Sequence, residues 1–297
     1  MKIRGHETFP LREGWIRKGV KNILEYPRLF TDKATNPCDI LGIGTNMVKS
    51  LRYWLITIGV IEEVTENNQK NQRLTPLGEL INQYDKYYEE DGTLWTIHYM
   101  LAKNKELATS WYWFFNEFML TSFNKIIFVD ELRAYLKSNY DYTCSDKTLE
   151  DDYDCLLRTY YSKDKDILPE NTIRCPLTEL HLIDEDDKGD SQFKEYKKII
   201  PNKDSLPPLV VYGVICEQAK SSEVLISDLM DKPCNIAKIF NMDRSTCFYY
   251  LEQLQKDGLI SISRTAGLDV IKLINKMSFE DALRHYYINI SGDVINE

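Results

Sequence analysis

Long hydrophobic runs are missing from this chain. None approaches the roughly 20 apolar residues that a membrane-spanning helix requires, and the first residues, Met1 to His6, lead into no signal-like apolar segment. The sequence therefore predicts a cytoplasmic protein that has no contact with a membrane.

Paired cysteines are missing as well. The seven cysteines are an odd number and include no Cys-x-x-Cys pair, so we expect neither a disulfide framework nor a structural zinc site. The sequence also lacks a phosphate-binding glycine loop, a dinucleotide fingerprint and the order of a Ser/His/Asp triad. Nucleotide-dependent enzymes and serine hydrolases are therefore not indicated.

Positive charge is scarce for a protein that would coat nucleic acid. The 297 residues carry a formal net charge of −9, but the charge is uneven. Residues 1–60 contain ten Lys or Arg against five Asp or Glu, whereas residues 139–200 contain nine against sixteen. A phosphate backbone would therefore be met most readily by the amino-terminal part.

The length suits two or three domains of about 100 residues each. Residues 92–140 are rich in aromatic and aliphatic side chains and predict a helical core, and the stretch from Pro201 to Pro208 marks a boundary. We therefore expect a mainly α protein in which two winged helix-turn-helix domains with small β-wings, residues 1–90 and 205–297, flank a helical central domain, residues 91–204.

The first winged-helix pattern begins with helical periodicity from Glu13 to Glu25. A short helix from Cys38 then ends at two glycines, Gly42 and Gly44, which permit a sharp turn before a second helix that starts near Thr45. On that second helix the apolar positions fall on one arc and the polar positions on the other. One face can pack while the other can read DNA.

A β-wing should follow this second helix. Val60 to Val64 predicts a strand, Asn67 to Gln72 a loop, and Thr75 the cap of a helix with Pro76 in its first turn. In a helix-turn-helix the amino-terminal end of the second helix enters the major groove. The predicted DNA-binding residues of this domain are Thr45, Asn46, Lys49, Arg52, Tyr53, Lys70 and Arg73. The alternative is a winged helix that contacts protein.

A second copy of the pattern starts at Leu209. It comprises a short helix from Asn235 to Phe240, a turn, a helix from Ser245 and a wing from Ile260 to Ile271. Glu252 lies close to the predicted reading face and positive charge is sparse, which favours a partner protein or a homodimer as strongly as DNA. The predicted DNA-binding residues here are Arg244, Ser245, Thr246, Tyr249 and Arg264.

An acidic cluster marks the centre of the chain. On a helix that begins at Ser145, the carboxylates of Glu150, Asp151 and Asp154 are neighbours at three- and four-residue spacing, and such oxygens suit Mg²⁺ or Mn²⁺. These three residues are the candidate metal ligands and catalytic residues. The alternative is a solvated acidic face, in which Arg158 forms an ion pair with Asp154.

One histidine stands beside a carboxylate in sequence, in the pair His6-Glu7. Such a pair can transfer protons, although a packed or capping histidine is the commoner meaning of this pattern. The histidine is therefore a secondary candidate.

Particular strings resemble a known family. The sequences GHETFPLREGWIRKG (residues 5–19) and LGIGTNMVKSLRYW (residues 41–54) are similar to proteins encoded beside bacterial DNA phosphorothioation genes, and LEDD (149–152), LRTY (157–160) and CPLTEL (175–180) are weaker matches. The resemblance covers most of the chain. It implies a component of an Ssp-type sulfur-modification and defence system in which such a protein nicks DNA.

The resemblance further implies three partners: a cysteine desulfurase, a sulfur-inserting protein similar to ATP pyrophosphatases, and an ATPase. It identifies no catalytic residue. Three hypotheses for the function therefore stay open. The first is a DNA-binding protein that nicks double-stranded DNA to allow sulfur insertion, and its alternative is a non-enzymatic winged-helix adaptor or transcriptional regulator. The third is a pure protein-interaction module.

Overall fold

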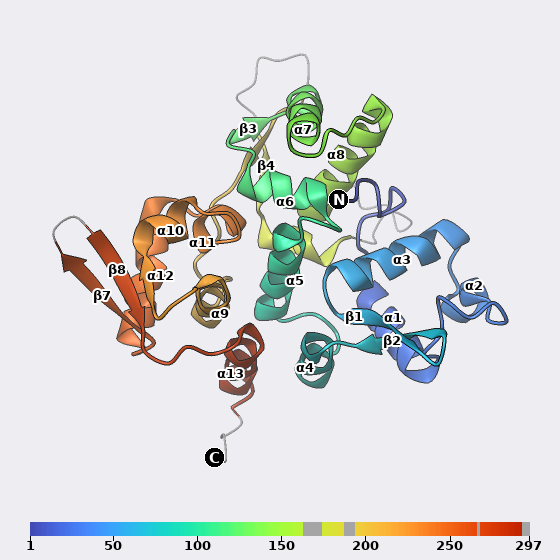
Figure 1. The fold of residues 1–297 in the computed structure, drawn as a ribbon, viewed down its shortest axis with the longest axis horizontal. Helices are drawn as coiled ribbons and strands as arrows, with labels where there is room; N and C mark the ends of the chain where they lie inside the picture. Colours follow the sequence, from blue (N-terminus) through green and yellow to red (C-terminus); the bar gives the residue numbers. More distant parts are fainter. Residues whose placement is uncertain (163–173, 187–193, 266–267, 293–297) are drawn as a thin grey trace.

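The computed structural model describes residues 1–162, 174–186, 194–265 and 268–292, and its described part is mainly helical (Figure 1). No helix within those ranges combines the length and apolarity needed to cross a bilayer. The predicted mainly α fold is therefore confirmed, with three small antiparallel sheets added to the helices.

The first ninety residues follow the expected order of elements. Three helices, α1 (Trp15–Glu25), α2 (Pro37–Leu41) and α3 (Thr45–Thr57), precede a hairpin of β1 (Ile61–Glu66) and β2 (Gln69–Leu74), and α4 (Pro76–Tyr84) comes next. Residues 69–72, predicted as loop, instead belong to β2, because Glu63 to Glu66 pair with them in an antiparallel register.

Local sequence signals fix the ends of these helices. The Asn36 side chain accepts a hydrogen bond from the Cys38 N–H and so caps α2, which then ends at Gly42 with a φ of 62°. Thr75 caps α4 in the same way by accepting from the Gly78 N–H. The turn and the cap that the sequence indicates are therefore present.

The middle of the chain is built around aromatic side chains. It contains α5 (Asp91–Lys103), α6 (Thr109–Asn116), α7 (Lys125–Tyr140), α8 (Asp146–Tyr160) and the 3-10 helix η1 (Pro176–Leu180). A sheet that no sequence pattern predicts joins them, with β5 (Tyr196–Lys198) between β3 (Ser122–Phe123) and β4 (Ile183–Glu185). Its strands are two or three residues long, too short for a visible period in the sequence.

The last part of the chain again places helices before a hairpin. Four helices, α9 (Pro208–Gln218), α10 (Ile226–Asp231), α11 (Ile236–Ile239) and α12 (Arg244–Lys256), are followed by β7 (Ile260–Thr265) and β8 (Leu268–Leu273). A short strand, β6 (Glu223–Leu225), pairs with the far side of β8. Asp243 caps α12 by accepting from the Thr246 N–H.

The last helix connects the carboxyl-terminal part of the chain with α4 and α5. α13 (Phe279–Ser291) packs against α9 and also against α4, and the rings of Tyr84 and Tyr287 stack 5.3 Å apart. The hydroxyl of Tyr286 accepts a hydrogen bond from the Gly92 N–H at the start of α5. The buried apolar side chains form one continuous core that includes residues of all three predicted domains, and the predicted domain boundaries stay a prediction.

Candidate nucleic-acid interface

The amino-terminal end of α3 exposes a polar surface. Thr45, Asn46 and Lys49 are exposed, while Leu51 and Trp54 on the opposite arc are fully buried. Residues three and four apart on a helix lie on the same face, so these exposed side chains form one patch. The first turn of α3 follows a glycine, Gly44, which leaves space in front of the helix end.

The cations further along this face are held by acids of the hairpin. Arg52 donates two hydrogen bonds to Glu63, at 2.7 and 2.8 Å, and Lys70 reaches the same carboxylate at 3.0 Å. Burial opposes ionisation of Glu63, but the hydrogen bonds and charges of these cations outweigh it and lower the pKa of the carboxyl. Arg73 forms a separate and more exposed pair with Glu62 at 2.8 Å.

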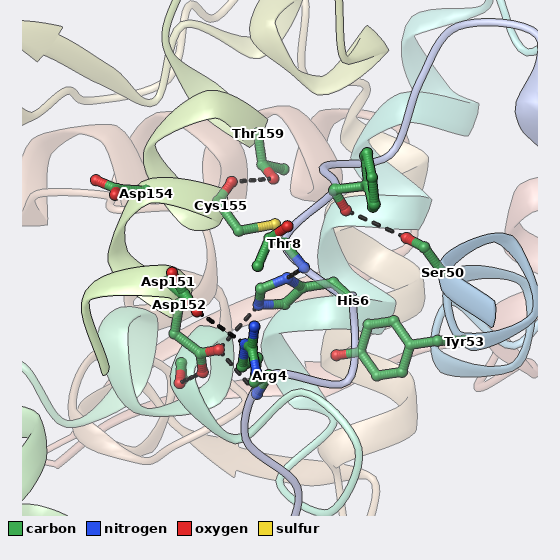
Figure 2. A network of polar contacts seen from close by, with 12 residues as sticks. Arg4, His6, Thr8, Ser50, Tyr53, Asp151, Asp152, Asp154, Cys155 and Thr159 are labelled. Atoms are coloured by element: carbon green, nitrogen blue, oxygen red, sulfur yellow. Dashed lines mark hydrogen bonds and ion pairs between the residues drawn. The ribbon is translucent and has the colours of Figure 1, made fainter. Parts of the chain in front are cut away.

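Tyr53 is not part of this exposed surface, and its predicted role in DNA binding stays a prediction. The side chain is buried, and its hydroxyl donates to the carbonyl of Leu107 at 2.8 Å. Burial and the nearby charge of Asp152 raise the pKa of Tyr53. Tyr53 is buried because a segment distant in sequence lies over its ring: residues 2–10, which we call the strap (Figure 2).

The corresponding end of α12 is partly covered. Arg244 and Ser245 are exposed, but Thr246 is buried and does not lie on the exposed face as expected, so its predicted role in DNA binding stays a prediction. Tyr249 is half-buried, and the ammonium of Lys203 lies 4.5 Å from its ring centre. The linker before α9 therefore restricts this helix face.

The remaining predicted residue of the second wing is Arg264. Its backbone pairs with Asp269 in the hairpin, but its side chain lies outside the described part of the structure. Its role therefore stays a prediction.

The three candidate metal ligands lie on α8 without converging. Asp151 is buried and forms ion pairs with Arg4 at 2.8 Å and Lys147 at 2.9 Å, whereas Asp154 pairs with Lys125 at 2.7 Å. Glu150 is half-buried. Within the ranges that the structure describes, no three His, Cys, Asp or Glu side chains are placed to hold a metal ion together. The three carboxylates could therefore hold one metal ion together only if the ion pairs of Asp151 and Asp154 opened.

Arg158 also differs from the expectation. Its guanidinium donates to the backbone carbonyls of Asp154, at 3.1 Å, and Thr8, at 2.8 Å, instead of pairing with the Asp154 carboxylate. A residue of α8 thus holds the end of the strap.

The most deeply placed acid, Asp152, was not among the predicted site residues. One carboxylate oxygen accepts from His6 Nε2 and from the Arg4 N–H, both at 2.8 Å, and the other accepts from Ser110 Oγ at 2.5 Å (Figure 2). The Thr8 N–H donates to His6 Nδ1 at 3.1 Å, so Nδ1 acts as the acceptor and Nε2 as the donor to Asp152. His6 is a packed histidine, and 146 residues separate it from its partner, so no local pattern could have revealed the pair.

Comparison with known families identifies the chain. The family described as "Protein of unknown function (DUF4007)" matches residues 3–287. The chain belongs to the DUF4007 family.

Two solved structures share the fold. A magnesium ion-bound SspB crystal structure is 20% identical, with a TM-score of 0.83, and a second SspB crystal structure is 20% identical, with a TM-score of 0.84. Each match covers 99% of this chain and 90% of the other. A search of curated proteins found no match.

In this DUF4007 chain the strap adds basic residues beside α3. Arg4, Glu7 and Thr8 have left-handed backbone conformations, with φ of 58°, 50° and 71°, which cost free energy in residues other than glycine. The bonds to Asp152 and Arg158 hold this conformation in place. Between the strap, α3 and β1 lies a pocket of about 470 Å³, which we call the strap pocket. The charged residues that line it are Lys2, Arg4, Glu7, Lys49, Arg52 and Glu63.

Proposed function

We propose that this protein binds double-stranded DNA through a winged helix formed by α1, α2, α3 and the β1–β2 hairpin. The observation that carries the proposal is the patch of Thr45, Asn46 and Lys49, which is exposed at the amino-terminal end of α3. In a helix-turn-helix this end enters the major groove. An asparagine there can bind adenine with two hydrogen bonds, and a lysine can contact guanine or a phosphate.

The hairpin would supply further phosphate contacts. The side chains of Lys70 and Arg73 are 51% and 59% exposed, so phosphates can reach both without unfolding. Arg52 is different, because its two hydrogen bonds to Glu63 occupy the guanidinium edge that would read guanine. We propose that Arg52 orients the hairpin against α3, and that base reading falls to Asn46.

The DNA proposal is tested by fluorescence anisotropy with labelled duplexes at several salt concentrations. Asn46→Ala should weaken binding to the preferred sequence more than to others, because it removes a base contact. Lys49→Ala should weaken binding to all sequences. Lys220→Ala is the matched control, because Lys220 is an exposed lysine outside the proposed interface, and its affinity should equal that of the wild type. Absence of wild-type binding at low salt would refute the proposal.

We further propose that the chain acts in the cytoplasm as a component of a DNA phosphorothioation and defence system. The likeness of its fold to SspB and the strings shared with proteins encoded beside phosphorothioation genes support this. The expected partners are the cysteine desulfurase, the sulfur-inserting protein and the ATPase of that system.

The carboxyl-terminal helices and the β7–β8 hairpin would form a second winged helix. Thr246 is buried and Lys203 covers the ring of Tyr249, so we propose that this unit binds a partner protein or a second copy of the chain rather than DNA. Arg244 and Ser245 are the exposed residues of α12 that would take part.

Metal-dependent DNA nicking is the second candidate function. SspB has been crystallised with a magnesium ion, and the carboxylates of Glu150, Asp151 and Asp154 remain the proposed ligands for Mg²⁺ or Mn²⁺. Their present ion pairs would have to open first. Nicking predicts conversion of supercoiled plasmid to open circle with added metal, and its loss in Asp154→Ala with duplex binding retained. A folded wild-type protein that leaves the plasmid intact with both metals would contradict nicking.

A further inference from the structure

The strap pocket continues the exposed face of α3. Lys49 belongs to both, because it lies one turn after Thr45 and also lines the pocket. Arg52, one turn further along, lines the pocket as well. A DNA strand that follows the patch at the amino-terminal end of α3 would therefore pass the mouth of the pocket.

The free charges of the pocket are cationic on balance. Arg4 is held by Asp151 at 2.8 Å and Arg52 by Glu63. Neither Lys2 nor Lys49 forms an ion pair with any residue that the structure describes. The ammonium of Lys2 lies 5.0 Å from the ring centre of Tyr53, which orients it without neutralising it.

One acid opposes these lysines. Glu7 lines the same pocket from the strap, and it would repel an anion there. Removing the negative charge of Glu7 should therefore strengthen the binding of an anion, whereas removing a lysine should weaken it.

The strap is a fixed wall of the pocket. The Lys2 N–H donates to Thr109 at 3.0 Å, and Asp152 holds both His6 and the backbone of Arg4. Gly5 packs closely against the Tyr53 ring, and an added Cβ at this position would come within 2.4 Å of it. The position of Lys2 relative to Lys49 is therefore determined by packing and not by chance exposure.

We infer that the strap pocket binds a phosphodiester of the DNA backbone, with Lys2 and Lys49 as its cationic ligands. The inference rests on the proposed DNA binding and adds a contact that lies outside α3 and the hairpin. It also gives Asp152 a role, which is to hold the strap beside α3 through His6 and the Arg4 backbone. The pocket volume of about 470 Å³ leaves room for the attached sugar.

The salt dependence of duplex binding tests this inference. Each phosphate neutralised by a cation contributes about −0.9 to the slope of log K against log salt. Lys2→Ala should therefore weaken binding to all sequences and make the slope less steep by about 1, while Lys220→Ala changes neither. Glu7→Gln should strengthen binding severalfold, because it removes the opposing charge.

A third variant tests the geometry without altering charge. Gly5→Ala places a methyl group against the Tyr53 ring, so the strap must move and the slope should change as in Lys2→Ala. Circular dichroism checks that the variant folds, and the Lys2 and Glu7 variants test the inference even if it does not.

The outcomes separate the inference from the proposed function. If Lys49→Ala weakens binding while Lys2→Ala and Glu7→Gln behave like Lys220→Ala, DNA binding through α3 stands and the strap pocket is overturned. If wild-type protein binds no duplex at low salt, both fail. Opposite effects of Lys2→Ala and Glu7→Gln support the inference.

Discussion

His98 should make the stability of the fold depend on pH. The ring lies on α5 and is fully buried, with Nδ1 2.9 Å from the Tyr160 hydroxyl on α8 and Nε2 2.8 Å from the Ile239 carbonyl on α11. Because a carbonyl only accepts, Nε2 carries the proton and Nδ1 accepts from Tyr160. Protonation of Nδ1 would place a charge in the core and leave the tyrosine hydroxyl facing another donor.

Burial lowers the pKa of His98 from 6.5 to about 4, although the hydrogen bond to Ile239 works in the other direction. In the unfolded chain the ring takes up a proton near pH 6.5, whereas in the folded chain it does so only near pH 4. Acidification therefore favours the unfolded state across this window. The contribution of His98 is fully present above the unfolded pKa and is lost as the pH falls toward the folded pKa, by about 3 kcal/mol in all.

Urea unfolding of the wild type and His98→Gln at pH 7.5 and pH 4.5 measures this effect. Glutamine does not titrate, so the wild type should lose about 2 to 3 kcal/mol more stability than the variant on acidification. Carboxylates contribute to both proteins and cancel in the comparison. Equal losses in the two proteins, or a proton resonance of the His98 ring that titrates near pH 6.5, would refute the reasoning.

Two other substitutions test the packing around the helices. Gly78→Ala should destabilise the protein by roughly 1 to 3 kcal/mol, because its Cβ would come within 2.0 Å of the Val60 carbonyl oxygen; a thermal unfolding midpoint equal to that of the wild type would contradict this close approach. Asp243→Ala removes the cap of α12 and should cost about 1 kcal/mol; duplex affinity should stay at the wild-type value, and a marked loss would instead place α12 in the DNA interface.

Helix ends could be predicted from the sequence because their signals are local. Thr75 before Pro76 predicts a cap, and its side chain accepts the expected hydrogen bond. The start of α3 at Thr45 was confirmed for the same reason. These interactions involve neighbours within a few residues, so they form regardless of the surrounding fold.

The faces of the helices could be predicted only in part. Periodicity places Tyr53 and Thr246 on polar arcs, but it cannot show that the strap lies over Tyr53 or that other residues pack around Thr246. The partners of Asp151 and Asp152 were missed for the same reason. Arg4 and His6 lie nearly 150 residues away in the chain, and an acidic run on a helix looks the same whether it binds metal, water or a distant arginine.

The contact of α13 with the start of α5 has a consequence for synthesis of the protein. Gly92 and Thr93 meet Tyr286 and Tyr287 across a separation of 194 residues. At a translation rate of about 5 to 20 residues per second, Tyr286 and Tyr287 are synthesised roughly 10 to 40 seconds after the start of α5 that they contact. During that interval the nascent chain exposes the part of the surface under α13 that lies on α4 and α5. Chaperone capture during translation, and slow completion of the fold, are therefore properties to expect of this architecture.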